Sequence, residues 1–203
     1  MDVTALIATI VDNDVSAFDA ALQASPVLAR AVLSDGATRQ DAADFFLPTL
    51  GRYLMTGDTA LHIAAAAYRV DMVRSLLAAG ADARARNRRG GEPLHDSATG
   101  APGSLAWDPS AQAQVITLLI AAGTDPNARD KSGTTPLHKA VRTRCAAAVE
   151  ALIAGGGDPM LKTKNGSTAL ALAETTSGRS GAGSPEARME QVKIVKRLEA
   201  NRI

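Results

Sequence analysis

The sequence predicts an all-α protein in which helix-turn-helix units stack side by side into an elongated solenoid. Two observations predict this fold. A short motif recurs at nearly constant spacing, and the hydrophobic residues make up 46% of the chain although aromatic residues make up only 3%. Alanine and aliphatic side chains suit closely stacked helices, and a repeat unit of this size buries its apolar face against its neighbours. With 203 residues, the chain is long enough for one domain.

The motif occurs four times, and each copy starts at a glycine: GDTALHIAA from Gly57, GGEPLHDSA from Gly90, GTTPLHKAV from Gly133 and GSTALALAE from Gly166. The first two copies lie about 33 residues apart, as do the last two, and the step between them is longer by about ten residues. A second glycine series, which consists of Gly80, Gly123 and Gly156, recurs with the same long and short steps. Both series therefore indicate one repeat period, with an insertion in the second copy.

Each motif position has a local structural reason. Three copies have a threonine where a helix N-cap is expected, namely Thr59, Thr135 and Thr168, whereas Glu92 takes this place in the second copy. Pro93 and Pro136 follow at the first helical position, where the missing N–H costs no hydrogen bond. The second helix of each unit contains an aliphatic pair such as Leu76 and Leu77, and it ends at a glycine of the second series.

The motif histidines are predicted to be structural. His62, His95 and His138 each stand three residues after the capping position, where a ring can bond back to the N-cap and across to the next repeat. Packed helices lie about 8 to 10 Å apart, whereas zinc ligands lie about 2.0 to 2.3 Å from the metal. We therefore expect no metal site. In the last copy Ala171 replaces the histidine, as expected of a copy that bridges to no further repeat.

A period of about 33 residues that carries T-x-L-H-x-A resembles the ankyrin repeat family. The segments AAGADARARNRRG and AAGTDPNARDKSG are also similar to the family pattern. The resemblance implies an ankyrin-repeat solenoid with projecting turn or hairpin fingers and a function as a non-catalytic protein-protein interaction scaffold without a cofactor. In this family the target is usually recognised by the fingers and the inner helices.

The domain organisation follows from the repeat arithmetic. Residues 57–203 are expected to form four repeats: 57–89, 90–132 with an insertion at 99–112, 133–165, and 166–203 with an insertion at 175–188. Glycine, serine and proline in both insertions predict loops. Residues 1–56 are expected to form a helical N-terminal cap, with helices over 2–11 and 15–24. A second helical pair over 26–34 and 38–50 would be a degenerate repeat, because Leu28 falls in register with Leu61.

Two surfaces are candidate binding sites for an acidic protein partner. The finger candidates are Arg84, Arg86, Arg88, Arg89, Lys131 and Lys164. The second candidate is a notch at the opposite end of the helices, with the two insertions as walls and Arg142 and Arg144 as its floor. Arg179 and Trp107 lie in these walls, and the indole is expected to staple its own loop rather than to anchor a partner.

Composition argues against other functions. The charge is nearly balanced, with 22 basic and 21 acidic residues, and no aromatic residues are interleaved with the basic ones, so nucleic acid is not expected. No stretch is long enough to span a membrane. The single cysteine, Cys145, excludes an internal disulfide, and we expect a cytoplasmic monomer.

Two alternatives remain open at this stage. The insertion loops could form a sensor for a peptide or a small ligand. An enzyme that uses Cys145 as its nucleophile ranks third, because the sequence offers neither an orienting group nor an oxyanion donor beside it.

Overall fold

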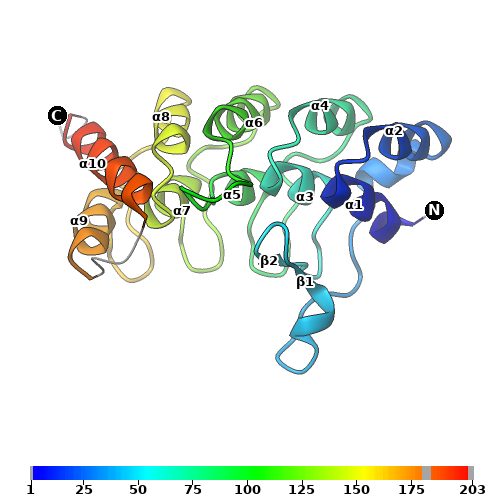
Figure 1. The fold of residues 1–203 in the computed structure, drawn as a ribbon, viewed down its shortest axis with the longest axis horizontal. Helices are drawn as coiled ribbons and strands as arrows, with labels where there is room; N and C mark the ends of the chain where they lie inside the picture. The colour runs from blue at the N-terminus through cyan, green and yellow to red at the C-terminus, as the bar shows by residue number, and fades with distance from the viewer. Residues whose placement is uncertain (1, 180–183, 201–203) are drawn as a thin grey trace.

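Helices pair in sequence order, and the pairs stack in a row (Figure 1). The computed structural model describes residues 2–179 and 184–200, without the side chains of residues 176–179. The helices are α1 (Val3–Asp12), α2 (Val15–Ala24), α3 (Ala60–Ala66), α4 (Val70–Ala78), α5 (Pro93–Ser97), α6 (Pro109–Ala121), α7 (Pro136–Arg142), α8 (Ala146–Ala154), α9 (Ala169–Arg179) and α10 (Pro185–Glu199). Among the described residues, none of these helices is long and apolar enough to cross a membrane.

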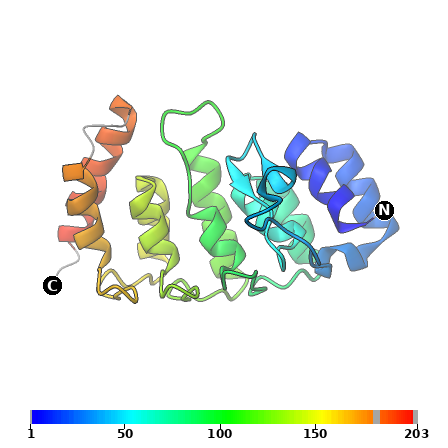
Figure 2. The ribbon, with the colours of Figure 1, turned by 90° about the horizontal axis from the view of Figure 1, so that it is seen from below.

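The helices form two layers. Figure 1 shows α1, α3, α5 and α7 side by side in one layer, and α2, α4, α6 and α8 in the other. We call these layers, with α9 and α10 added respectively, the inner and the outer helices. The connections that lead from α4, α6 and α8 to the next pair lie together at one end of the helices (Figure 2). These connections are the fingers that the repeat pattern predicts.

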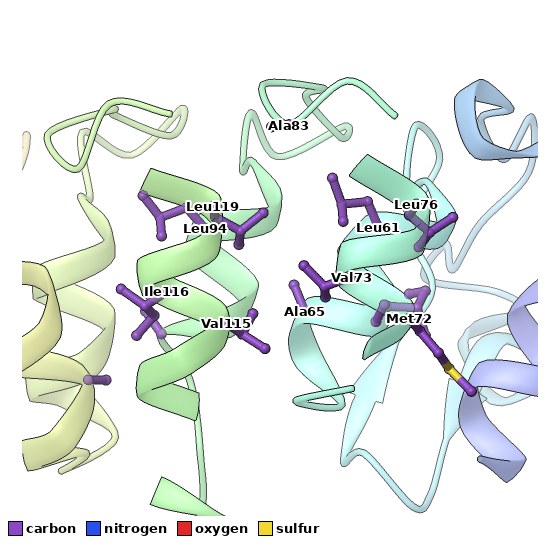
Figure 3. Packing of buried hydrophobic residues seen from close by; sticks show 14 of the residues in the cluster. Leu61, Ala65, Met72, Val73, Leu76, Ala83, Leu94, Val115, Ile116 and Leu119 are labelled. Carbon is purple, nitrogen blue, oxygen red and sulfur yellow. The ribbon is translucent and has the colours of Figure 1, made fainter. Parts of the chain in front are cut away.

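An apolar core runs between the layers along the whole stack. Between the second and third helix pairs, Leu61 and Leu76 lie opposite Leu94 and Leu119 (Figure 3). All four side chains are fully buried. Burial of such a side chain contributes about 1.5 to 3 kcal/mol to stability. Because the core is shared between neighbouring pairs, no pair can be removed without exposing the faces of the next one.

The first helix pair forms as the sequence predicts. Asp2 caps α1 by accepting a hydrogen bond from the backbone N–H of Ala5 at 2.8 Å, and Asp14 caps α2 through Ala17 at 2.9 Å. Asn13 ends α1 in a left-handed conformation with φ of 57°. Since α1 packs against α3, this pair occupies the place of a repeat in the stack.

The second helical pair expected over 26–50 does not form. The chain has instead two short 3₁₀ turns, η1 (Pro26–Arg30) and η2 (Ala42–Phe45), and a hairpin of β1 (Phe46–Leu47) and β2 (Arg52–Tyr53), which pair antiparallel. Leu28 thus belongs to a turn that packs on α3, not to a repeat helix.

Turn-forming residues explain why this pair is absent. Pro48 and Gly51 build the hairpin turn, in which Gly51 has φ of 59° and its N–H bonds the carbonyl of Pro48 at 3.3 Å. Gly36 is required where two backbone segments meet, because a Cβ there would lie 2.2 Å from the nitrogen of Thr56. We call residues 34–55 the N-terminal lobe. It projects below the inner helices in Figure 1.

The two insertions differ from each other. The first forms the loop between α5 and α6, although the last part of the predicted loop, 109–112, already belongs to α6. The second, predicted as a loop over 175–188, instead lengthens two helices, since residues 175–179 belong to α9 and 185–188 to α10. Residues 180–183 lie outside the described part. Ser184 accepts a bond from Ala187 N–H at 3.2 Å, and Pro185 at N1 completes a strong helix start that the glycine-rich composition concealed.

Candidate interaction surface

The three motif histidines connect each repeat to the next one. Each ring accepts at Nδ1 a hydrogen bond from the backbone N–H at the cap: Thr59 to His62 at 3.1 Å, Glu92 to His95 at 3.1 Å, and Thr135 to His138 at 3.3 Å. Because Nδ1 is an acceptor, Nε2 carries the proton and donates to a carbonyl of the following repeat. These carbonyls belong to Gly91, Thr134 and Ser167, at 3.2, 3.2 and 3.1 Å. Both ring nitrogens are therefore occupied.

Burial favours the neutral form of the His95 and His138 rings. Burial, together with the nearby charge of Lys139, lowers the pKa of His95 to about 4. Burial also lowers the pKa of His138. A protonated ring would lose its acceptor at Nδ1 and would place a charge in the core, so the neutral tautomer is the one that fits the stack.

The threonines of the motif cap their helices. Thr59 and Thr135 accept bonds from the N–H groups of His62 and His138, both at 3.4 Å. Thr168 does the same for Ala171 at 3.2 Å. Glu92, which replaces the threonine in the second copy, directs its Oε1 to Arg86 at 2.8 Å.

Backbone hydrogen bonds join the finger tips. The N–H of Arg88 bonds the carbonyl of Thr56 at 2.7 Å, that of Lys131 bonds Arg89 at 3.0 Å, and that of Lys164 bonds Ser132 at 3.1 Å. Asn87 holds its own finger by accepting bonds from the N–H groups of Arg89 and Gly91. Asp130 holds the next finger in the same way through Ser132 and Thr134. We call the three equivalent tips, residues 84–91, 127–134 and 160–167, the finger edge.

The stack itself engages two of the basic residues predicted to bind a partner. Arg86 donates from Nε and Nη2 to Glu92 at 3.1 and 2.8 Å, and from Nη1 to the carbonyl of Arg129 at 3.3 Å. Arg88 donates to the carbonyl of Ala37 in the N-terminal lobe at 2.6 Å. Substitution of either arginine would therefore affect the stability of the stack as well as the binding of a partner.

The other four predicted finger residues are available on the surface. Arg84, Arg89, Lys131 and Lys164 are all exposed. None of them takes part in an ion pair among the described residues. These four side chains can therefore meet an acidic partner without breaking an internal ion pair.

An ionic cluster that the sequence did not indicate fixes the N-terminal lobe. Arg52 of β2 lies 2.7 Å from Asp58, which is fully buried, and 3.1 Å from Asp96 of α5. Although burial alone lowers the pKa of the guanidinium, Asp96 and Asp58 raise it above its ordinary value. Burial would raise the pKa of the Asp96 carboxyl, but Arg52 and Lys139 hold it below its ordinary value. Nothing in the sequence places Arg52 near α5, because the lobe has no repeat register.

The same cluster brings three metal-ligand types together, but it does not suit a metal. Ligand atoms of Asp58, His62 and Asp96 lie within 4.8 Å of one another. Arg52 already supplies the positive charge between the carboxylates, and Asp58 accepts further bonds from Met55 N–H at 2.8 Å and from the amide of Asn87 at 2.9 Å. A cation would have to displace these donors.

Trp107 packs within its own loop. Its indole donates to Oε1 of Gln112 at 3.0 Å, and Gln112, which is fully buried, donates in turn to the carbonyl of Ser97 at 2.9 Å. A Cβ on Gly100 would lie 2.9 Å from the indole and 2.8 Å from the sulfur of Cys145. The ring therefore closes the base of the α5–α6 loop, which is the arrangement expected of a staple.

The two walls of the predicted notch touch each other. The described parts of both insertions lie at the end opposite the fingers (Figure 2). However, Ser184 at the start of α10 donates to the carbonyl of Pro102 in the α5–α6 loop at 3.3 Å, so one wall touches the other. Arg142 is exposed at the end of α7, whereas Arg144 is half-buried in the turn that follows, with φ of 60°. The Arg179 side chain lies outside the described residues.

A groove of about 580 Å³ lies on the outer layer between α8 and α10. Its lining combines three alanines with charged side chains: Ala146, Ala147, Ala200, Glu150, Glu190, Lys193, Lys196 and Arg197, with Pro109 at one end. Glu190 accepts a bond from the N–H of Ala146 at 3.0 Å and pairs with Lys193 at 2.6 Å. No sequence pattern indicates this groove, because it depends on how α10 sits against α8.

Cys145 lies in the core and not in a reactive site. It is fully buried, and burial raises the pKa of its thiol, which is opposite to what a nucleophile requires. His138, the motif histidine seven residues before it in the chain, uses both ring nitrogens in hydrogen bonds and is not available as a base. The thiol lies 3.4 Å from the hydroxyl of Thr143 and behaves as a small core side chain.

Stacked helix pairs that share one core and are joined by bonds from repeat to repeat define an α-helical repeat protein. Comparison with family models extends this result, since ankyrin repeat models match residues 56–88 and, as several copies, residues 119–173. Residues 56–88 and 119–173 are therefore ankyrin repeats. Its repeats are of a kind that commonly mediates protein-protein interaction, and the family is typically non-enzymatic. A search of curated proteins found no match.

Proposed function

We propose that this protein is a non-catalytic scaffold that presents its finger edge to an acidic protein partner. The observation that carries the proposal is the set of four exposed basic residues on the fingers, Arg84, Arg89, Lys131 and Lys164, without internal ion pairs among the described residues. Charge complementarity of this kind selects partners and speeds their association. The proposal includes a monomeric state and a cytoplasmic location, in keeping with a single buried thiol.

Rigidity supports the same function. The fingers are tied to one another by backbone bonds, and the repeats are tied by histidine bridges. A partner would therefore meet side chains on an ordered surface, so that binding costs little conformational entropy.

The test is affinity capture from the native host with matched variants. Lys131→Ala with Lys164→Ala removes two exposed finger charges, whereas Arg74→Ala with Arg188→Ala removes the same charge from the outer helices. We expect an acidic partner to be captured by the wild type and the outer-helix variant and to be lost with the finger variant. Undiminished capture by a finger variant with wild-type melting behaviour would reject the finger edge. If capture is lost only with a third variant, Arg142→Ala, the binding site lies at the end of the helices opposite the fingers.

A second candidate function rests on the groove between α8 and α10. Its volume of about 580 Å³ suits a small ligand or a peptide side chain, and it adjoins the start of α6, where the first insertion ends. A thermal-shift screen would show a ligand that raises the melting temperature of the wild type. Ala147→Phe, which fills the groove, should abolish that shift, and an unchanged shift would place the ligand elsewhere.

A further inference from the structure

Basic residues occupy two equivalent positions in every finger of the finger edge. The first position, the base row, consists of Arg86, Arg129 and Lys162. The second position, the tip row, consists of Arg88, Lys131 and Lys164. Within each row the residues recur with the same spacing as the glycines that end the second helices. All six positions are therefore basic in register with the stack.

The base row sets the distance between fingers. Arg86 donates to the carbonyl of Arg129 at 3.3 Å, and Arg129 donates to the carbonyl of Lys162 at 2.8 Å. Each guanidinium thus reaches one repeat ahead and fixes the next finger. The arginines of this row bond to the neighbouring fingers. They therefore fix the spacing of the finger edge and are not the residues expected to bind a partner.

The tip row leaves its lysine charges in solvent. The side chain of Lys131 passes close to Gly90 of the preceding finger, where a Cβ would lie 3.2 Å from the lysine Cγ. Lys164 passes Gly133 in the same way, at 3.1 Å. Both lysines are exposed, and neither belongs to an ion pair in the described part of the chain. Because the backbones of both lysines are held by hydrogen bonds between fingers, the two lysines recur with the repeat.

We infer that the finger edge binds an acidic polypeptide in an extended, polyproline-II-like conformation, with one carboxylate facing each of the exposed tip lysines, Lys131 and Lys164. This inference rests on the proposed function and specifies its partner. Stacked helices lie about 8 to 10 Å apart. A polyproline II helix rises about 3.1 Å per residue with three residues per turn, so every third side chain lies on one face, about 9.3 Å from the previous one. Glutamates at every third residue would therefore face successive lysines. A β-strand with the same spacing would turn alternate carboxylates away.

The finger edge has no platform on which nucleic-acid bases could stack. Among residues 84–91, 127–134 and 160–167 there is no aromatic side chain on which a base could stack. The cations instead follow the period of the repeats, which a regularly spaced acidic peptide matches.

The experiment measures binding of the full chain to two fluorescent peptides by anisotropy at low salt. One peptide contains four Glu-Pro-Pro units, and the other has the same composition with its glutamates in one block. We expect the regular peptide to bind about five- to tenfold more tightly, and Lys131→Ala with Lys164→Ala to remove most of this difference. Lys131→Arg with Lys164→Arg should retain it, and Arg74→Ala with Arg188→Ala should leave it unchanged.

Equal affinity for both peptides, or tighter binding of a single-stranded oligonucleotide, would overturn the inference. The proposed function is judged separately. If capture of the native partner still depends on Lys131 and Lys164 although the peptides do not discriminate, the scaffold role stands and only the extended acidic partner is wrong. If capture is also independent of these lysines, both the finger-edge function and the extended acidic partner are wrong.

Discussion

At the scale of single residues, the stack depends on neutral histidines that are bonded at both nitrogens. His95 accepts from Glu92 N–H and donates to the carbonyl of Thr134, so one side chain satisfies two backbone groups in two repeats. Removal of the ring leaves both groups buried without a partner. Removal of the ring should therefore lower the free energy of unfolding more than a substitution at an exposed position does.

We predict that His95→Ala and His138→Ala each lower the free energy of unfolding by about 1 to 3 kcal/mol. Urea denaturation followed by circular dichroism would measure this change. Arg74→Ala, on the exposed side of α4, is the matched control and should change little. Denaturation midpoints equal to the wild type in both histidine variants would show that the bridges do not stabilise the fold.

The lowered pKa of His95 also predicts how stability depends on pH. Its ordinary value is 6.5 and its value in the fold is about 4, so between these values the unfolded chain binds a proton that the folded chain does not. Stability is therefore fully present above about pH 6.5 and falls as pH decreases towards 4, by up to about 3 kcal/mol from this group. His95→Gln should show a shallower decline over this window in the same denaturation experiment. An identical slope for the two proteins would contradict the assigned pKa.

At the scale of elements, local signals decided what could be predicted. The repeat helices were predictable because caps, prolines and glycines recur in phase, as with Thr135, Pro136 and Gly156. The second insertion was not, because Ser184 and Pro185 start α10 within a segment whose composition is typical of loops. The N-terminal lobe was not predictable either, because Arg52 pairs with Asp96 of a distant helix, without any register to relate them.

Arg52 should hold the N-terminal lobe on the inner helices. We predict that Arg52→Gln destabilises the protein by about 3 to 5 kcal/mol, since it leaves the buried Asp58 carboxylate without its charged partner. Limited proteolysis should then cut within residues 34–55 much faster than in the wild type. Arg39→Gln, on the exposed side of the same lobe, is the control. Wild-type resistance in the Arg52 variant would mean that other contacts fix the lobe.

At the scale of the whole molecule, the two ends of the helices have different roles. At one end the fingers are tied together and carry cations in register with the repeats. At the other end Trp107 closes the base of the α5–α6 loop, and this loop touches the start of α10. The sequence showed which residues are basic, but only the structure separates arginines engaged by the stack, such as Arg86 and Arg88, from exposed lysines such as Lys131.

Hydrogen exchange of the full chain, alone and with its captured partner, would show directly whether the finger edge is the interaction surface. We predict slower exchange on binding in residues 84–91, 127–134 and 160–167, with little change in α8 and α10. Protection confined to α8 and α10, with unchanged exchange in all three finger tips, would contradict it and would place the interaction in the outer groove.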